Sequence, residues 1–357
     1  MAIPLFASSL APYQDAIADK LREVAASGRY ILGPEVKAFE DEFAAWVGAA
    51  QCVGVGNGTD ALQIALRAAG VGPGDDVVMP SFTFYATAEA AANLGARPVF
   101  CDIDPATFCV TADAVERALT SRTRAVVPVH LFGNVAPVEE IRALGVPVIE
   151  DAAQAAGSTR NGAKAGTLGD AATFSFYPSK NFPCVGDGGA VVTNDEEVGA
   201  LARRLRFHGS TDKQTYTEIG WNSRLDALQA GVLRVLLPEL DGWTQARRNA
   251  AALYAHAGLG ELVELPQATP GSDPAWHLYV VRHERADELV AGLNEAGIAA
   301  RAYYRVPVHR QPAMAEFGAV QLPGTEEAAR THFAIPMGTG LQESQVEEVV
   351  HTLQRLC

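Results

Sequence analysis

The stretch QCVGVGNGTDALQIALRAA (residues 51–69) decides the fold of this chain. A short run with β-branched residues leads through a glycine-rich turn into a helical pattern that begins near Thr59. The same alternation continues to residue 193, with further strands expected at 77–79, 98–101, 125–129, 147–150, 172–176 and 190–193. This alternation predicts an α/β fold, in which a mainly parallel, seven-stranded sheet lies between layers of helices. Ligands bind such sheets at the carboxyl ends of the strands.

The pattern changes after residue 193, where longer helical segments replace the short alternation. A smaller region follows, with a strand expected at 277–282 and helices near 286–296 and 343–356. The length of 357 residues suits about two domains. We therefore expect a large domain at 1–240, with an N-terminal arm at 1–34, and a smaller C-terminal α+β domain at 241–357.

Composition narrows the function. The formal net charge of −14 argues against nucleic-acid or anionic-membrane partners, because both require basic surfaces. No apolar run approaches the length of a membrane span, and the first residues lack the positive region expected of a secretory signal. The five scattered cysteines predict reduced thiols and a cytoplasmic location. The eight histidines are dispersed without an HExxH motif, so we expect no metal.

The segment TFSFYPSKNF (173–182) places Lys180 just after an expected strand, among aromatic residues. An ammonium group there is partly desolvated, which lowers its pKa and favours the neutral, nucleophilic amine. Such amines form Schiff bases with carbonyl compounds, and pyridoxal phosphate is their commonest partner. A lysine that reaches solvent past an aromatic edge is the alternative explanation.

The segment VPVIEDAAQ (146–154) ends an expected strand in Asp151 and places Gln154 one helical turn later. A pyridine cofactor withdraws electrons only while its ring nitrogen stays protonated, and a buried aspartate enforces that state. Gln154 can donate a hydrogen bond to the phenolate oxygen of such a ring. The alternative is an aspartate that caps a helix, with Gln154 on a solvated face.

Three other segments complete this set. Gly58 and Thr59 lead into a helix whose free N–H groups suit a phosphate, although neither GxGxxG nor the Walker pattern is present. Phe84 follows a strand and offers a ring for stacking, with core packing as the alternative. Asn222 lies at the expected start of a later helix, where such a residue is usually a cap. Together these signals supply every part that pyridoxal phosphate requires.

Ordered motifs along nearly the whole chain also resemble the DegT-type nucleotide-sugar aminotransferases, which are pyridoxal-phosphate enzymes of fold type I. The matching segments are YILGPEV (30–36), GNGTDALQIAL, PSFTFYATAEA, VIEDAAQ, FSFYPSKN, GDGGAVVTND and NSRLDALQA. The resemblance implies that Lys180 forms the Schiff base, Asp151 pairs with the pyridine nitrogen and Gln154 contacts the ring hydroxyl. It places Phe84 against the ring.

The resemblance also assigns the cofactor phosphate and an oligomeric state. Thr59, Asp60 and Ser175 fall at the phosphate site, and Asn222 would reach it from the neighbouring subunit. A homodimer with shared active sites is therefore implied.

The chain departs from the family pattern where relatives border the sugar. Tyr303 stands in place of a histidine and Arg305 in place of a proline, ahead of His309. We expect these three residues near the substrate, so the departures leave the identity of the sugar open. For His309, a structural role in its loop is the alternative explanation. A diphosphate also needs a basic rim in so acidic a chain, and the candidates are Arg301, Arg305, Arg310 and Lys164. The alternative is that these four are solvated surface charges.

The resulting hypothesis is a ping-pong transamination. An amino acid, expected to be L-glutamate, gives its amino group to the cofactor, and Lys180 moves the α-proton. A nucleotide-linked ketosugar then receives the amino group. The alternatives are a sugar dehydratase of the same family, which has histidine at the lysine position, a cofactor-binding regulator, and a nicotinamide-dependent oxidoreductase.

Overall fold

The computed structural model describes residues 2–357. Its central sheet has seven strands, in the spatial order β1 (Gln51–Val55), β11 (Gly189–Thr193), β10 (Ala171–Ser175), β7 (Ile149–Asp151), β6 (Thr123–Val126), β2 (Asp76–Pro80) and β3 (Arg97–Cys101). Pairing between β7 and β6 is reduced to two parallel bridges, Val126–Val148 and Val129–Asp151. Only β11 runs antiparallel to its neighbours. The predicted mainly parallel seven-stranded sheet is therefore confirmed.

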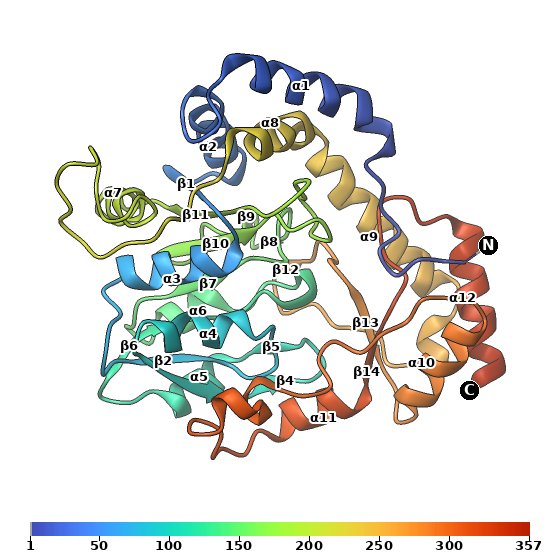
Figure 1. The fold of residues 1–357 in the computed structure, drawn as a ribbon. Helices are drawn as coiled ribbons and strands as arrows, with labels where there is room; N and C mark the ends of the chain where they lie inside the picture. The colour runs from blue at the N-terminus through green and yellow to red at the C-terminus, as the bar shows by residue number, and fades with distance from the viewer. Residues whose placement is uncertain (1) are drawn as a thin grey trace.

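Alternate residues of the strands face two different cores, because successive side chains of a strand point to opposite faces. Val53 and Val55 pack with α3 (Gly58–Ala68), α4 (Ala86–Asn93) and α7 (Glu196–Leu205). The other face, which includes Cys52, is covered by α1 (Gln14–Ser27), α2 (Pro34–Val47), α5 (Ala112–Ala118), α6 (Val138–Arg142) and α8 (Ala227–Leu236). Figure 1 shows α1, α2 and α8 grouped beside β1.

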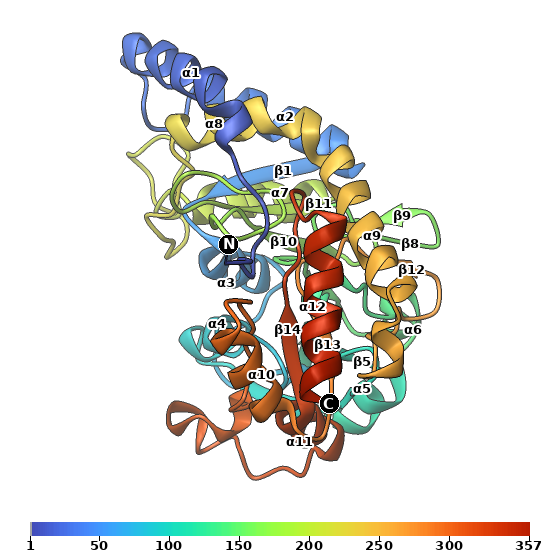
Figure 2. The same ribbon diagram turned by 90° about the vertical axis from the view of Figure 1, so that its right-hand side faces the viewer.

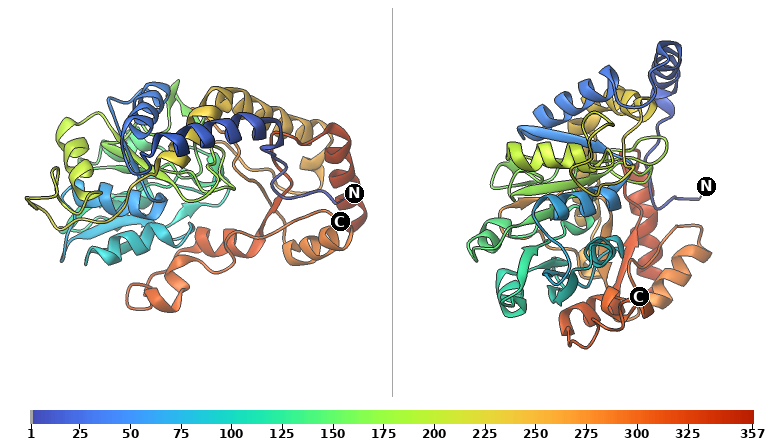
Figure 3. Two further views of the ribbon diagram at one scale, coloured as in Figure 1. Left: turned by 45° about the horizontal axis from the view of Figure 1, so that its top comes forward. Right: turned by 60° about the vertical axis from the view of Figure 1, so that its left-hand side comes forward.

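A third core lies in the C-terminal part, around the antiparallel pair β13 (Tyr279–Arg282) and β14 (His332–Ile335). It is covered by α9 (Leu240–His256), α10 (Ala286–Glu295) and α12 (Glu343–Leu356). Figure 2 shows α12 beside this pair, and Figure 3 shows the two termini at the same end. Ile3 and Ala7 belong to this core, so the start of the chain packs with its end. The domain division near residue 240 remains a prediction.

Shorter elements fill the connections, and none of them follows from the alternation in the sequence. They are the hairpin β4 (Ile103–Asp104)–β5 (Cys109–Val110), the small sheet β12 (Ser272–Asp273)–β8 (Thr159–Arg160)–β9 (Ala163–Lys164), and α11 (Pro323–Thr331).

Side-chain caps set where several helices begin. Asn57 accepts the Asp60 N–H at the start of α3, and Asp226 accepts the Gln229 N–H at the start of α8. The cap of α8 is thus Asp226, and Asn222 lies in the preceding loop.

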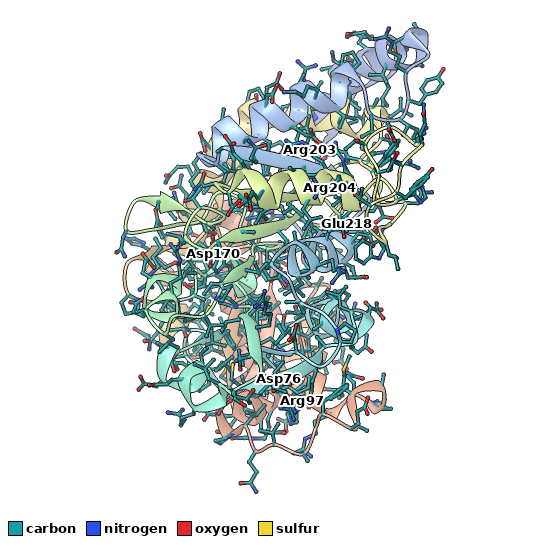
Figure 4. The ribbon with its side chains drawn as sticks, turned by 90° about the vertical axis from the view of Figure 1, so that its left-hand side faces the viewer. Asp76, Arg97, Asp170, Arg203, Arg204 and Glu218 are labelled. Carbon is teal, nitrogen blue, oxygen red and sulfur yellow. The ribbon has the colours of Figure 1, made fainter. Side chains whose placement is uncertain are left out.

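An ion pair between an exposed arginine and a buried aspartate joins two strands at the edge opposite the carboxyl ends of the strands. Asp76 begins β2 and is fully buried, and Arg97, which begins β3, donates to it at 2.8 and 2.6 Å. Figure 4 shows the two side chains together. Hydrogen bonds from Arg97 and Thr120 outweigh the burial of Asp76, so the pKa of this carboxyl is lowered. No helix within residues 2–357 combines the length and apolar character that crossing a membrane requires.

Candidate active site

A cavity of about 930 Å³ opens at the carboxyl ends of β1, β2, β7 and β10. This is the edge at which an α/β sheet binds its ligands. The residues predicted from the sequence that line it are Gly58, Thr59, Asp60, Phe84, Asp151, Gln154, Ser175, Lys180 and Tyr303. Asn222, Arg305 and His309 do not line it.

Lys180 lies in the turn that follows β10. Its backbone N–H donates to the Tyr177 carbonyl at 2.8 Å, and the flanking Phe176 and Phe182 are buried with ring centroids 5.4 Å apart. The two rings anchor the turn in the core beneath the lysine. Burial lowers the pKa of the Lys180 amine to about 8, while the Asp151 charge opposes this shift. A much larger share of this amine is therefore neutral near neutral pH than in a solvated lysine.

Asp151 ends β7 and is 5 % exposed. Its Oδ2 accepts the Thr87 hydroxyl at 2.9 Å, and its Oδ1 accepts the Ala153 N–H at 3.2 Å. Burial raises the pKa of Asp151, whereas the two hydrogen bonds and the Lys180 charge lower it. The carboxylate is thus held in one orientation by donors that favour its charged form.

The orientation of Gln154 follows from its hydrogen bonds. Its Oε1 accepts the Phe132 N–H at 2.7 Å, so its amide nitrogen is the end left to donate. Phe132, which donates this hydrogen bond, has a left-handed backbone (φ 58°). Tyr304 lies beside this amide, and burial raises the pKa of its phenol. Gln154 is therefore arranged as a donor at the cavity wall.

The start of α3 forms another wall of the cavity. Its first turn carries free backbone N–H groups, and the hydroxyls of Thr59 and Ser175 lie at the same wall. A Cβ atom on Gly58 would lie 2.8 Å from the Ser175 Cβ, closer than real Cβ contacts allow. Glycine at 58 is thus what lets the start of the helix approach Ser175. Together they form a part of the cavity wall whose N–H and hydroxyl donors suit an anion such as phosphate.

Two aromatic residues flank the cavity between these walls. Phe84 is 58 % exposed, and its ring centroid lies 6.1 Å from that of Tyr304. A ring exposed to this extent is not packed in the core, which was the alternative explanation for Phe84. Its face is available to stack on a planar ligand.

The structure places three predicted residues outside the cavity. Arg305 donates to the Ala329 and Arg330 carbonyls and pairs with Asp287 at 2.5 Å. His309 is buried, with Nδ1 2.6 Å from the Ser81 hydroxyl and Nε2 3.0 Å from Glu326. Both side chains are engaged in local packing, so their positions do not support contact with a substrate. Asn222 is exposed in the loop between α7 and α8 and contacts Arg224.

The expected basic rim is only partly assembled. Lys164 lies 3.6 Å above the Trp46 ring, and Arg310 pairs with Glu326 at 2.8 Å. Arg301 alone among the four candidates contacts a residue of the cavity, because its guanidinium lies 5.1 Å from the centroid of the Tyr303 ring.

Sequence reasoning missed several residues of the site. Thr87 and Tyr304 line the cavity, as does the buried His277. Thr87 lies four residues after Thr83, in the segment that also contains Phe84. This spacing can be read from the sequence, but the contact between Thr87 and Asp151 cannot. His277 gave no signal, because the loop that carries it is far away in sequence.

The donor set fits pyridoxal 5'-phosphate. The aldehyde of this cofactor needs a lysine with a lowered pKa, and its ring nitrogen needs a buried carboxylate. Its ring oxygen can accept a hydrogen bond from an amide, and its phosphate suits a helix start beside two hydroxyls. Fold and site together define a pyridoxal-phosphate enzyme of fold type I.

Comparison with known proteins specifies the family. The sequence model of the DegT/DnrJ/EryC1/StrS aminotransferase family matches residues 13–354, and the chain belongs to this family. It is an aminotransferase, as its resemblance to the DegT-type enzymes implied.

Similar proteins cover nearly the whole chain. A dTDP-3-amino-3,4,6-trideoxy-alpha-D-glucose transaminase of Streptomyces venezuelae is 45% identical over 338 residues, 92% of this chain and 88% of that protein. A protein of Geobacillus stearothermophilus named "pleiotropic regulatory protein" is 47% identical over 342 residues, 93% and 92% of the two chains. The crystal structure of S. venezuelae DesV in complex with a ketimine intermediate superposes with a TM-score of 0.95, at 42% identity, over 99% and 98% of the chains.

Proposed function

We propose that this enzyme transfers an amino group from L-glutamate to a nucleotide-linked ketosugar. The product would be an amino sugar nucleotide for the biosynthesis of glycans or of natural-product glycosides. The observation that carries the proposal is the pair formed by Lys180 and Asp151, which line one cavity and influence each other's charge. The similar transaminase of S. venezuelae, whose name states a nucleotide-linked amino sugar, supports the class of substrate.

The residues of the chain divide the chemistry between them. When bound, the cofactor supplies an electron-withdrawing ring that stabilises the carbanion left by loss of the donor's α-proton. Lys180 Nζ takes that proton as a base and returns it as an acid, which its lowered pKa permits near neutral pH. Asp151 keeps the ring nitrogen protonated, and Gln154 donates to the ring oxygen. Thr59, Ser175 and the first turn of α3 hold the phosphate, with Asp60 at the same wall.

The substrate side of the site rests on fewer contacts. Tyr303 lines the cavity, and the Arg301 guanidinium lies against the Tyr303 ring. This pair is the proposed contact for the sugar and its phosphates. Phe84 is proposed to stack on the cofactor ring. Arg305 and His309 are not proposed as contacts.

We also propose a homodimer with shared active sites. Large apolar side chains remain exposed at Tyr30, Ile31, Tyr216 and Ile219, and the last is 91 % exposed. Exposure of this kind, near the loop that carries Asn222, is typical of a surface that a second subunit covers. Asn222 would then reach the phosphate of the partner's site. A cytoplasmic location is consistent with the free thiols of Cys52, Cys101, Cys109 and Cys184.

The alternatives to an aminotransferase are a sugar dehydratase and a regulator that binds the cofactor. A sugar dehydratase of the same family would have histidine where Lys180 lies in the cavity. A regulator that only binds the cofactor is suggested by the name of the similar G. stearothermophilus protein. A regulator does not need Lys180 and Asp151 arranged for proton transfer.

The test is incubation of the purified enzyme with L-glutamate and a panel of dTDP-, UDP- and GDP-linked 3- and 4-ketosugars, followed by mass spectrometry. We expect one nucleotide class to yield an amino sugar, with 2-oxoglutarate formed in equal amount. L-Glutamine in parallel identifies the donor. Failure of every ketosugar would contradict the proposed substrate class.

A further inference from the structure

Arg247 of α9 carries a positive charge in the interior without a carboxylate to balance it. The side chain is 3 % exposed, and no carboxylate oxygen within residues 2–357 lies within 4.0 Å of it. Burial lowers its pKa to about 10, and no neighbouring charge opposes that shift. Buried charges are normally paired, because moving a charge out of water is unfavourable. The neighbouring Arg248 shows the usual arrangement, since its Nε lies 2.9 Å from Asp273.

The guanidinium of Arg247 is only partly satisfied. Its Nη1 donates to the Trp276 and His277 carbonyls at 3.1 and 3.3 Å, and its Nη2 donates to Ser8 Oγ at 3.2 Å. Its Nε is buried without any partner. The unused donor is therefore the Nε–H, which lies on the same edge of the planar group as Nη2. An arginine can bind a carboxylate through two hydrogen bonds from this edge.

A small cavity lies against Arg247 and leads to the catalytic lysine. Its volume is about 80 Å³, and its lining includes Ser8, Ser9, Asn181 and Thr339. A water molecule takes about 30 Å³, so this space suits a group of a few atoms. The only charged residues of its lining are Lys180 and Arg247, so it is a positive site in a chain of net charge −14.

Two further contacts make the small cavity suitable for an anion. Ser8 Oγ already accepts hydrogen bonds from Arg247 and from the Thr339 N–H, which leaves its own proton to donate. Phe6, Ser179 and Lys180 line both the small cavity and the large one. A ligand in the small cavity therefore lies next to the lysine that moves the proton.

We propose that Arg247 and Ser8 bind a carboxylate of the amino-acid donor in this small cavity. The inference rests on the proposed function, since Lys180 must reach the α-carbon of the donor and the carboxylate is attached to that carbon or to its side chain. Binding supplies the missing counter-charge of Arg247 and fixes the donor beside Lys180. Succinate, a dicarboxylate that has no amino group, is the probe for this site.

The first experiment separates the two halves of the reaction. Arg247→Met and Arg247→Lys are compared with Arg248→Met, a matched control one residue away. The concentration of L-glutamate that half-saturates the single-turnover reaction should rise at least about 10-fold in Arg247→Met and less in Arg247→Lys. The half-saturating concentration of the accepted ketosugar, measured with the pyridoxamine-loaded enzyme, should stay within about twofold of wild type. The control should change neither.

The second experiment uses binding without turnover. Succinate should bind the wild-type holoenzyme in calorimetry and compete with glutamate, and Arg247→Lys should weaken it several-fold. The comparison of wild type with Arg247→Lys remains valid even if Arg247→Met does not fold. Glutamine locates the group: a loss shared by glutamine assigns the α-carboxylate, and a loss confined to glutamate assigns the distal one.

The proposal is overturned if succinate binds wild type and Arg247→Lys equally, or if a folded Arg247→Met variant keeps the wild-type response to glutamate. An equal weakening of donor and ketosugar would also overturn it. Failure of the proposed function looks different, because the wild-type enzyme itself would then not react with glutamate.

Discussion

The Thr87 hydroxyl donates to Asp151 Oδ2 across 2.9 Å, between two buried side chains. Thr83 Oγ1 lies 3.2 Å from Thr87 Oγ1, so it can donate to the hydroxyl that donates to Asp151. Both threonines line the cavity. The carboxylate at the tip of β7 is thus held by a residue at the start of α4, and its orientation depends on the packing of that helix.

Replacing Thr87 by valine should lower kcat about 10-fold, because hydrogen bonds to charged groups contribute about 1.5–3 kcal/mol. The Thr87 hydrogen bond lowers the pKa of Asp151, so its loss raises that pKa further. The charged carboxylate then persists only at higher pH, and the acidic limb of the kcat profile should shift upward. Thr87→Ser should restore both values. An unchanged profile in Thr87→Val would show that the contact has no catalytic effect.

The pKa of about 8 for Lys180 predicts how the apoenzyme captures its cofactor. Only the neutral amine attacks the aldehyde, so the capture rate should rise with pH and level off above about 8. At pH 7 the neutral fraction is roughly 300-fold larger than for a lysine with the ordinary pKa of 10.5. Stopped-flow absorbance of apoenzyme mixed with pyridoxal phosphate measures this rate. A midpoint near 10 would mean that the amine is solvated in the protein.

Gly58→Ala should weaken cofactor binding at least about 10-fold, since the new Cβ would lie 2.8 Å from the Ser175 Cβ and push the start of α3 away. Gly242→Ala in α9 is the control, because nothing lies within 4 Å of a Cβ there and alanine favours a helix. Fluorescence titration of the two apoenzymes with pyridoxal phosphate gives the dissociation constants. Equal constants would exclude this helix start as the phosphate site.

Mixed dimers test whether active sites are shared. Lys180→Ala and Asn222→Ala should each lose activity at limiting cofactor. If Asn222 acts on the partner's site, each mixed dimer has one complete site out of two, so purified mixed dimers should show about half of wild-type activity. Co-expression with two affinity tags isolates these dimers. No recovery would place Asn222 in the site of its own subunit.

The sequence predicted the sheet well because each strand of the alternation carries its own local signal. Loops between the strands are less evident in the sequence: α4 begins only at Ala86, after the segment that places Thr83 and Phe84 in the cavity. The second strand of the small pair, β14, was missed. All four residues of β14 are buried, as they would also be in an apolar helix segment. Over four residues, hydrophobic periodicity does not distinguish a buried strand from a buried helix.

The predicted site residues also fall into two groups, those located by a local sequence signal and those whose position depends on tertiary packing. Lys180, Asp151, Gln154 and Thr59 follow strands or begin a helix of the sheet, so local signals locate them. Arg305 and His309 lie in loops whose partners, Asp287 and Glu326, come from separate helices. Their engagement in ion pairs depends on tertiary packing that the order of residues does not reveal. Arg247 escaped notice for the same reason, because its missing partner shows only in the folded chain.

The central claim is that Lys180 moves the donor's proton in a transamination. Its most direct test is a single turnover of the pyridoxal-phosphate-loaded enzyme with L-glutamate and no ketosugar, followed by quantification of 2-oxoglutarate. We predict one equivalent of 2-oxoglutarate per subunit in wild type and none in Lys180→Ala on the same timescale. No 2-oxoglutarate from the loaded wild type, or an equal amount from Lys180→Ala, would contradict the account.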